Sequence, residues 1–465
     1  MRTSVRMVAS MCIFAVSLAG GLGLASGAEP KAAAAMPPPA VPAFKMLLPA
    51  MELRDGDTLV FLGDSITHQC LYTQYIEDFY YSRFPKLRIH FHNAGVGGDR
   101  AADALARFDG DVAAYKPKYV TVLLGMNDGA YRDFDKPTFD TYQKDMSALL
   151  EKLAAIGATA IPITPTMHDA RAARLRAKPM EPRDTYYNGV LALYGAWLRE
   201  VAQERGLGFV DMYSPLNQLT LDGRKKDANF TLIKDGVHPD PPGQVVMATA
   251  LLADICPRSN VSAIIVQERK GKLAATAAHG KIGDFQADDD RISFTFTAEA
   301  LPWVLPPEAL PGCVLTHAGH HYSNESIAAR NLKPGKYELK IDGQSIGIYP
   351  DTQLAFRLEL EGNEKTPQYQ QALRVALLNK QRNEQVVHPL RDLWLKVKIG
   401  RRQIEQLTAR DAPHLAAKKE QFEKWLAAEF EPGLAKLQAQ LKEFEERIYE
   451  ANQPVARKYE LVRVK

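Results

Sequence analysis

The chain has 465 residues, of which 46% are hydrophobic and 24% are charged, and its formal net charge is +3. This is the composition of an ordinary globular protein, and the length allows about two or three domains. The nearly neutral charge gives no reason to expect nucleic acid or an anionic membrane surface as a partner.

The first residues have the pattern of a secretory signal. Arg2 and Arg6 precede an apolar stretch from Met7 to about Ala25, which ends in the small residues "ASGA". We therefore interpret residues 1–28 as a signal peptide. An uncleaved membrane anchor is the alternative, which the glycines and the small residues disfavour. Export to the periplasm or the extracellular space is the expected localisation, without stable membrane insertion after cleavage.

The next segment, residues 29–43, is a Pro/Ala-rich linker with too little apolar pattern to fold. Across residues 44–258, apolar runs alternate with helical patterns. The runs that indicate buried strands are Thr58–Leu62, Arg88–Phe91, Tyr119–Leu124, Thr159–Ile163 and Gly208–Met212. Continuous apolar runs, each followed by a helix, are typical of a parallel sheet covered on both faces. Residues 44–258 are therefore predicted to form one three-layer α/β/α sandwich.

The pattern changes after Pro257. Residues 259–360 form a predicted small β-rich region, whose strongest signal is a hairpin at Tyr337–Tyr349 around an Asp342-Gly343 turn. Residues 361–465 are predicted to be a helical C-terminal region. Its first helix begins with the Thr366-Pro367 pair, a good N-cap followed by a first-turn proline.

One apolar stripe distinguishes the last predicted helix. It consists of Leu434, Leu437, Leu441, Phe444 and Ile448, which step along a single helix face. We expect this face to pack on the rest of the protein, and a partner-binding coiled coil is the alternative. The Pro432-Gly433 pair is expected to break this helix from the preceding one.

Cysteine and histidine clusters carry little chemical signal. Three cysteines lie beyond the predicted signal peptide: Cys70, Cys256 and Cys313. An odd number cannot all pair within the chain, but one disulfide between two of them is possible. The three histidines of "HAGHH", at positions 317, 320 and 321, suggest a metal site, but a solvated loop is the preferred interpretation. No metal site is predicted.

Four short segments carry the residues of a chemical site. "GDS" closes the first predicted strand, "NAGVGGDR" the second and "GMND" the third, while "DGVHP" precedes the last helix of the sandwich. Ligands bind at the carboxyl ends of strands in such sheets. Segments distant in sequence are therefore expected to converge at one sheet edge.

The residue types in these segments suit a serine nucleophile. Ser65 needs a base to take its proton, and His238 is the candidate, since imidazole titrates near neutral pH. Asp235, three residues earlier, can hold the other ring nitrogen. The backbone N–H groups of Ser65 and Gly98, with the amide of Asn127, can form an oxyanion hole. Each residue alone reads as an ordinary turn or cap residue, and only their joint occurrence favours catalysis.

With these blocks, residues 57–253 resemble the SGNH hydrolase superfamily, the GDSL-type esterases and lipases. Its four named positions match Ser65, Gly98, Asn127 and His238, the last accompanied by Asp235. The resemblance implies a flavodoxin-like α/β/α fold and ester hydrolysis through an acyl-serine, with no metal or organic cofactor. The region after about residue 258 has no counterpart in the minimal family domain.

The substrate is less sharply indicated. "GDSIT" with "NAGVGGD" is similar to the acetylesterase branch of the family, and export favours an acetylated carbohydrate as the ester substrate. The alternatives are a lysophospholipase- or thioesterase-type GDSL lipase and a non-catalytic carbohydrate-binding or scaffold protein with a vestigial domain. His68, Arg100 and His168 are further candidates for substrate contact, and Asp64 is expected to cap the helix that follows Ser65.

Overall fold

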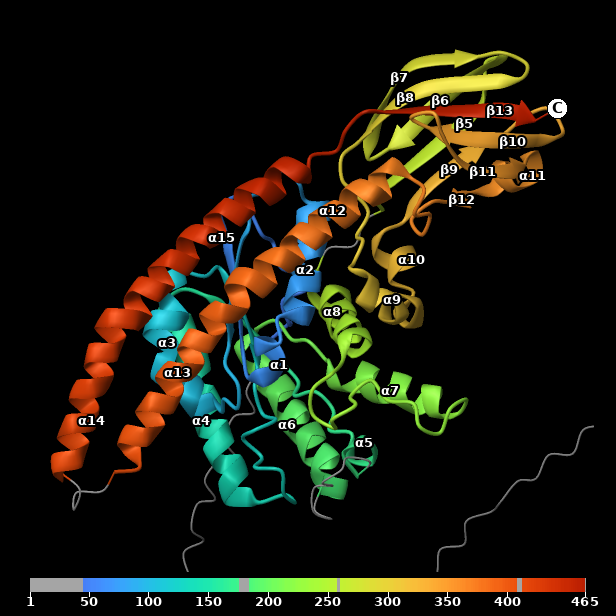
Figure 1. Cartoon of the computed structure of the whole chain (residues 1–465). Helices are drawn as coiled ribbons and strands as arrows, with labels where there is room; N and C mark the ends of the chain where they lie inside the picture. Colours follow the sequence, from blue (N-terminus) through green and yellow to red (C-terminus); the bar gives the residue numbers. More distant parts are fainter. Residues whose placement is uncertain (1–44, 175–183, 257–259, 408–411, 465) are drawn as a thin grey trace, which may run out of the picture. The chain divides into compact units, whose positions relative to one another are not determined.

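Four parallel strands form the sheet that carries the predicted site (Figure 1). The structure is a computed structural model that describes residues 45–174, 184–256, 260–407 and 412–464, so the predicted signal peptide and linker lie outside the described residues. The strands are β1 (Thr58–Gly63), β2 (His90–Gly95), β3 (Tyr119–Leu123) and β4 (Thr159–Ile163), in the order β2-β1-β3-β4. Nearly all their residues are buried, which explains their continuous apolar sequences.

Helices cover both faces of this sheet, which confirms the predicted three-layer α/β/α fold. They are α1 (Ser65–His68), α2 (Leu71–Arg83), α3 (Ala101–Asp111), α4 (Lys136–Ala155), α5 (Ala170–Arg174), α6 (Asp184–Arg205), α7 (Tyr213–Arg224) and α8 (Pro241–Ile255). The helix α2 packs against α8, and α3 packs against α4. One apolar core, with side chains such as Phe61, Val120 and Leu251, joins the sheet to these helices.

Two of the predicted strands differ from the observed ones. The second strand begins at His90 rather than Arg88 and continues through Asn93 to Gly95. The predicted fifth strand, Gly208–Met212, is reduced to a single parallel bridge between Ile163 and Val210. The chain leaves the sheet there because the next amides bond side chains instead, Asp211 N to Asp254 and Met212 N to the hydroxyl of Thr164.

The predicted β-rich region forms two sheets that share a core. Its strands are β5 (Ser262–Arg269), β6 (Lys272–Ala278), β7 (Gly280–Ala287), β8 (Arg291–Ala298), β9 (Glu325–Ala329), β10 (Lys336–Ile341), β11 (Gln344–Pro350) and β12 (Leu358–Glu359), with short helices α9 (Leu310–Thr316), α10 (Ala318–Tyr322) and α11 (Asp351–Phe356). The sheet orders are β11-β10-β13-β8-β7, in which β13 is Arg457–Val464, and β12-β9-β5-β6. The hairpin of β10 and β11 is confirmed, with Asp342 and Gly343 at φ of 52° and 80° in its turn.

The final strand, β13 (Arg457–Val464), was not foreseen. It lies between β10 and β8 in the five-stranded sheet, inside what the sequence analysis took as a helical region. Its residues alternate, with Tyr459 and Leu461 buried in the core of the two sheets. The chain therefore returns to the β-rich region after its helices.

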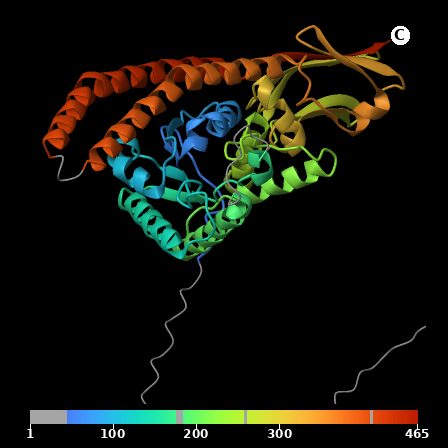
Figure 2. The ribbon, with the colours of Figure 1, turned by 60° about the horizontal axis from the view of Figure 1, so that its bottom comes forward.

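Long helices connect the two parts (Figures 1 and 2). They are α12 (Pro367–Arg382), α13 (His388–Glu405), α14 (Ala412–Trp425) and α15 (Glu431–Ala451). Thr366 caps α12 as predicted, since its hydroxyl accepts a hydrogen bond from the amide of Tyr369. The helix α12 packs against α2 of the α/β/α part, and α15 packs against both α12 and α13.

The predicted break at Pro432-Gly433 is wrong. A π-helical turn, Leu426–Phe430, joins α14 directly to α15, and Pro432 lies in the first turn of α15. Another π-helical turn, Asn383–Val387, precedes Pro389 in α13 in the same way. A proline clashes with the carbonyl one turn earlier, and a locally wider helix accommodates the ring without ending the helix.

The apolar stripe of α15 packs within the chain, as expected. Leu434, Leu437 and Leu441 contact a small core that contains Trp394. Ile448, at the far end of the stripe, is fully buried in the main core. The helix is therefore used in cis rather than as a coiled coil for a partner. Among the described helices, none is both long and apolar enough to cross a bilayer.

Candidate active site

Ser65 stands where β1 ends and a short helix begins. Asp64 is the N-cap residue of α1, and its Oδ1 accepts a hydrogen bond from the amide of Ile66 at 2.9 Å, as predicted for a cap. Gly63 is required immediately before it, because a Cβ there would lie 2.1 Å from the hydroxyl of Thr67. This tight turn lifts the Ser65 hydroxyl to the carboxyl edge of the sheet.

The predicted nucleophile, base and orienting acid are in hydrogen-bond contact. His238 Nε2 lies 2.8 Å from Ser65 Oγ, and His238 Nδ1 lies 2.7 Å from Asp235 Oδ2. The other carboxylate oxygen of Asp235 accepts the backbone amides of Val237 and His238, at 2.8 and 2.7 Å. Three residues of one loop therefore fix the imidazole with Nε2 directed at the serine.

The charge state of Asp235 suits this arrangement. Partial burial disfavours its carboxylate, but the hydrogen bonds from the ring and amide of His238 and the amide of Val237 outweigh that effect and hold the pKa of Asp235 well below its usual range. Asp235 therefore stays ionised at all ordinary pH values. A fixed negative charge at Nδ1 keeps the proton on that nitrogen and stabilises an imidazolium when one forms.

Two backbone amides in the loops after β1 and β2 are free to donate. Among the described residues, the N–H groups of Ser65 and Gly98 have no hydrogen-bond acceptor. Three adjoining amides are occupied: the amide of Ile66 bonds Asp64, that of Gly97 bonds His68 Nδ1 at 3.2 Å, and that of Asp99 bonds Val96 O. The amides of Ser65 and Gly98 are the two that the sequence predicts for the oxyanion hole. Gly98 adopts a φ of +69°, which favours glycine.

Asn127 follows β3 at the same edge, and its amide is oriented by three neighbours. Its Nδ2 donates to the carbonyl oxygen of Asp99 at 3.0 Å and lies 3.4 Å from Asp64 Oδ2. The hydroxyl of Tyr131 donates to its Oδ1 at 3.3 Å, which fixes which end of the amide carries hydrogen. The long contact to Asp64 leaves one N–H that an incoming oxyanion can capture.

Besides capping α1, Asp64 lies beside the Asn127 amide, so its charge state bears on the predicted oxyanion hole. Burial raises the pKa of Asp64 to about 7, although the Ile66 amide and the charge on His238 partly oppose this. A carboxyl group that is easily protonated repels a developing oxyanion less than a permanent carboxylate does. The burial of Asp64 thus suits its place beside the predicted hole.

The three further candidates lie in different surroundings. His68 is buried beneath the loop of Gly97 and points to α13, where its Nε2 lies 3.3 Å from Asp392. Arg100 is exposed at the start of α3 and pairs with Asp103. His168 is 1% exposed and packs edge-on to Tyr131 and Tyr187. Of the three, only Arg100 is open to a bound substrate.

Two groups of donors resemble metal ligands. His68, His388 and Asp392 form one group, and His320, Glu359 and Glu361 form the other. In the first group, His68 Nδ1 accepts the amide of Gly97, so Nε2 carries the proton of the neutral ring and donates to Asp392. A ring bonded in this way lacks a free nitrogen for a metal. In the second group, His320 lies on α10 and not in a loop as expected, and it pairs with Glu359.

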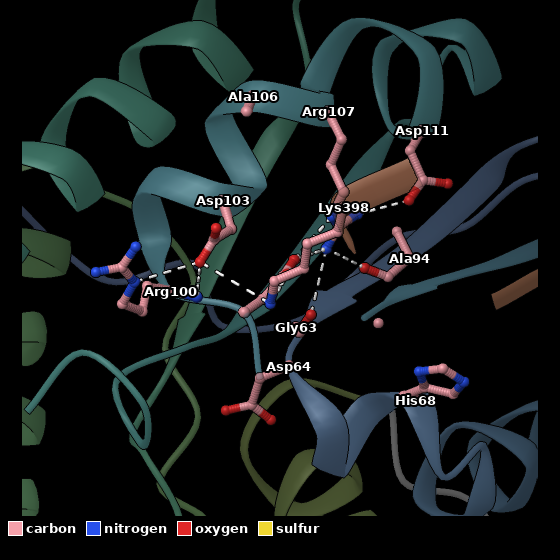
Figure 3. A network of polar contacts seen from close by, with 12 residues as sticks. Gly63, Asp64, His68, Ala94, Arg100, Asp103, Ala106, Arg107, Asp111 and Lys398 are labelled. Atoms are coloured by element: carbon pink, nitrogen blue, oxygen red, sulfur yellow. Dashed lines mark hydrogen bonds and ion pairs between the residues drawn. The ribbon is translucent and has the colours of Figure 1, made fainter. Parts of the chain in front are cut away.

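The sequence analysis missed a network of buried charges under the site (Figure 3). Arg107 donates to the carboxylates of Asp99 and Asp111 and to the carbonyl oxygen of Ala94, and all three charged side chains are nearly inaccessible to solvent. From α13, Arg391 forms two hydrogen bonds of 2.8 Å with Asp111, and Lys398 pairs with Asp99 at 2.8 Å. No local pattern signals such pairs, because charged residues on an amphipathic helix ordinarily face solvent.

Cys70, Cys256 and Cys313 are free thiols in the described part of the chain. They form no bridge that would tighten the site.

Known proteins resemble both parts of the chain. The profile of the GDSL-like Lipase/Acylhydrolase family matches residues 61–246. An acetylxylan esterase from Geobacillus stearothermophilus is 26% identical over 228 residues, which cover 44% of this chain and 96% of that enzyme. A solved structure, described as a gut microbial diltiazem-metabolizing enzyme, is 25% identical with a TM-score of 0.78 and covers 90% of this chain and 99% of its own. The first two similarities concern the α/β/α part alone, whereas the third extends into the β-rich and helical regions.

A shorter similarity is to the uncharacterized lipoprotein YqeF of Bacillus subtilis (strain 168). It is 47% identical over 45 residues, which cover 10% of this chain and 18% of that protein.

Proposed function

The chain belongs to the SGNH hydrolase superfamily of ester-hydrolysing enzymes through its residues 61–246, and on that premise we propose that it is an exported carbohydrate acetylesterase. The nucleophile of this proposal is Ser65, the base is His238 and the orienting acid is Asp235. The observation that carries it is the unbroken line of short contacts from Asp235 through His238 to Ser65 Oγ. The backbone amides of Ser65 and Gly98 and the side chain of Asn127 are the proposed oxyanion donors.

The proposed reaction has two halves. His238 Nε2 accepts the Ser65 proton as Oγ attacks the ester carbonyl carbon, and the negative oxygen of the tetrahedral intermediate takes hydrogen bonds from the donors. Collapse of the intermediate breaks the bond to the alcohol oxygen, which leaves with the proton from His238. Water then attacks the acyl-serine with His238 as base, and the acid departs from a restored Ser65 hydroxyl.

Two features support a small acyl group on a carbohydrate. The relative that matches the α/β/α part over almost its whole length is an acetylxylan esterase. The segments that bear the site residues contain no long, strongly apolar stretch that could cover a lipid chain. Export is supported by the signal-like pattern of residues 1–28 and by the short similarity to a lipoprotein.

Hydrolysis of p-nitrophenyl esters of increasing chain length tests the proposal. Acetate is expected to react fastest, and release of acetate from acetylated xylan is expected to follow. A phosphonofluoridate is expected to label Ser65 and no other serine, with Ser65→Ala as the unlabelled control. Faster hydrolysis of long-chain esters would favour a lipase-type enzyme. Failure of the folded protein to hydrolyse any ester would refute the proposal that it is an esterase.

A further inference from the structure

The helix α13 reaches the loop that carries Gly98, although it lies about 300 residues further along the chain (Figure 3). Lys398 Nζ donates to the carbonyl oxygen of Gly97 at 2.9 Å and pairs with Asp99 Oδ1 at 2.8 Å. Its side chain is 7% exposed. A Cβ on Gly98 would lie only 3.6 Å from the same ammonium group, so Lys398 packs directly against the turn.

The carbonyl that Lys398 holds belongs to the same peptide group as the Gly98 amide. A peptide group is planar and trans, so its C=O and N–H point in opposite directions. Holding the oxygen of Gly97 on one side therefore fixes where the N–H of Gly98 points on the other. The positively charged ammonium group that donates to this oxygen also polarises the peptide group and strengthens its N–H as a donor.

The position of Asn127, another of the proposed oxyanion donors, depends on the same loop. The carboxylate of Asp99 binds Lys398 and Arg107, while its backbone carbonyl accepts the amide of Asn127 at 3.0 Å. The loop from Gly97 to Asp99 thus connects the ammonium group to both Gly98 and Asn127. The residue that clamps this loop influences two of the three proposed donors.

We propose that Lys398 is a positioning residue for the oxyanion hole, so that a helix outside the hydrolase fold sets the catalytic rate of the site within it. This inference rests on the function proposed above. The solved structure that covers 90% of the chain includes such an appended region, whereas the acetylxylan esterase match covers 44%. The hole of this chain is therefore completed by an element that the smaller enzyme's match does not include.

Removal of the ammonium group leaves the fold with its other supports. Asp99 keeps two contacts with Arg107, at 2.8 and 2.7 Å, and Arg391 keeps its pair with Asp111. Lys398→Met retains most of the aliphatic stem and is expected to fold. Arg402 provides the matched control, since it lies one turn further along α13 and pairs with Asp103 at 3.0 Å without touching Gly97 or Asp99.

The test measures kcat and KM on p-nitrophenyl acetate with the full chain. Lys398→Met is expected to lower kcat about 10- to 100-fold while KM stays within a few-fold, because displaced donors weaken transition-state binding most. Lys398→Arg is expected to recover part of that loss, and Arg402→Met to leave kcat unchanged. Circular dichroism and thermal melting establish that each variant is folded; should Lys398→Met not fold, Lys398→Leu, which also lacks a donor for Gly97 O, takes its place with the same expected loss.

A double variant separates positioning from a general loss of structure. If Lys398 acts on the oxyanion hole, Lys398→Met combined with Asn127→Ala lowers kcat by less than the product of the single effects. A full product, or wild-type kcat in folded Lys398→Met, overturns the inference. If the wild type hydrolyses no ester or Ser65→Ala remains active, the proposed function fails instead, and the two failures are thereby distinguished.

Discussion

The predicted triad and the loop of the oxyanion hole lie at one sheet edge, yet they are held in opposite ways. His238 and Asp235 are 34% and 40% exposed, and they bond each other across three residues of one loop. Asp99 in the oxyanion loop is fully buried and takes its positive partners from α3 and from α13. The predicted base and its orienting acid are thus held within one loop, whereas the loop of the predicted oxyanion hole is held by side chains from two helices.

The same contrast extends along α2 of the hydrolase part. Its acids Glu77 and Asp78 are buried, and their partners come from α12: Arg382 and Asn383 donate to Glu77, and Asn379 donates to Asp78. An unpaired buried charge is strongly destabilising. The α/β/α part therefore has its sheet and covering helices within itself. Its buried acids Glu77 and Asp78, however, depend on hydrogen-bond donors from the C-terminal helical region.

The largest effect is expected at the triad. Replacement of His238 by Ala is expected to lower kcat by about 10⁴-fold or more, because Ser65 loses its base. The midpoint of thermal unfolding should stay close to that of the wild type, since the side chain is 34% exposed. Residual hydrolysis within tenfold of wild type would show that another residue is the base.

A variant of the buried charge network is expected to lose stability, in contrast to the triad variant, which is expected to lose activity while it stays stable. Arg391→Met removes two hydrogen bonds from Asp111, and both residues are fully buried. Loss of one partner from such a pair costs about 3–5 kcal/mol of unfolding free energy. Urea unfolding measures this, with Arg402→Met as an exposed control expected to stay within about 0.5 kcal/mol. A loss below 1 kcal/mol in Arg391→Met would mean that Arg107 and His92 satisfy Asp111 alone.

A variant of Asn127 tests the predicted oxyanion hole separately from the predicted triad, since its amide bonds the loop that contains Asp99. Asn127→Ala is expected to lower kcat about 10²- to 10³-fold, or roughly 2.7–4 kcal/mol of transition-state stabilisation, and to change KM little. Asn127→Asp should be at least as damaging, because a carboxylate would stand beside the oxyanion. Steady-state kinetics on a small acetate ester measures both. An increase in KM alone would reassign Asn127 to substrate binding.

The pH dependence of stability gives the smallest effect. Burial lowers the pKa of His92 to about 4, with Asp111 opposing and Arg391 assisting the shift. The native state therefore binds fewer protons than the unfolded state between about pH 4 and 6.5, so stability is present above this window and is lost as pH falls through it. Relative to His92→Gln, the wild type should lose about 3 kcal/mol of unfolding free energy across the window.

His90 supplies a control of opposite sign for that measurement. A hydrogen bond that its ring donates to the Glu445 carboxylate raises the pKa of His90, so its contribution to stability is present at low pH and is lost as pH rises through the raised value. Urea unfolding of His92→Gln and His90→Gln at several pH values should therefore shift the stability profile in opposite directions. Parallel profiles for the wild type and His92→Gln would mean that His92 is not held neutral in the native state.

Much of the architecture was predictable because its signals are local. The strands β1, β3 and β4, the hairpin at Asp342-Gly343 and the cap at Thr366 each depend on a few adjacent residues, and all are confirmed. The site residues were found in the same way, as short motifs at strand ends, and the structure brings five of them to one edge.

The missed features depend on partners far away in sequence. The strand β13 has an alternating pattern, but only its place between β10 and β8 gives it a sheet to complete. Arg382, Arg391 and Lys398 have the sequence context of solvent-facing helix residues, and their burial follows from acids about 300 residues earlier. The helix continued through Pro432 because the preceding turn widened, which depends on backbone geometry rather than on residue type.

The position of β13 also dictates the order in which the protein can be built. The strand lies in the middle of the five-stranded sheet, but it is synthesised after both of its neighbours, β8 and β10. Until then β10 and β8 present two unpaired edges, and open strand edges readily pair with other chains. A polypeptide that stops before residue 457 would keep every predicted catalytic residue and still carry an aggregation-prone gap. Synthesis must therefore include β13 before the edges of β8 and β10 are covered and can no longer pair with other chains.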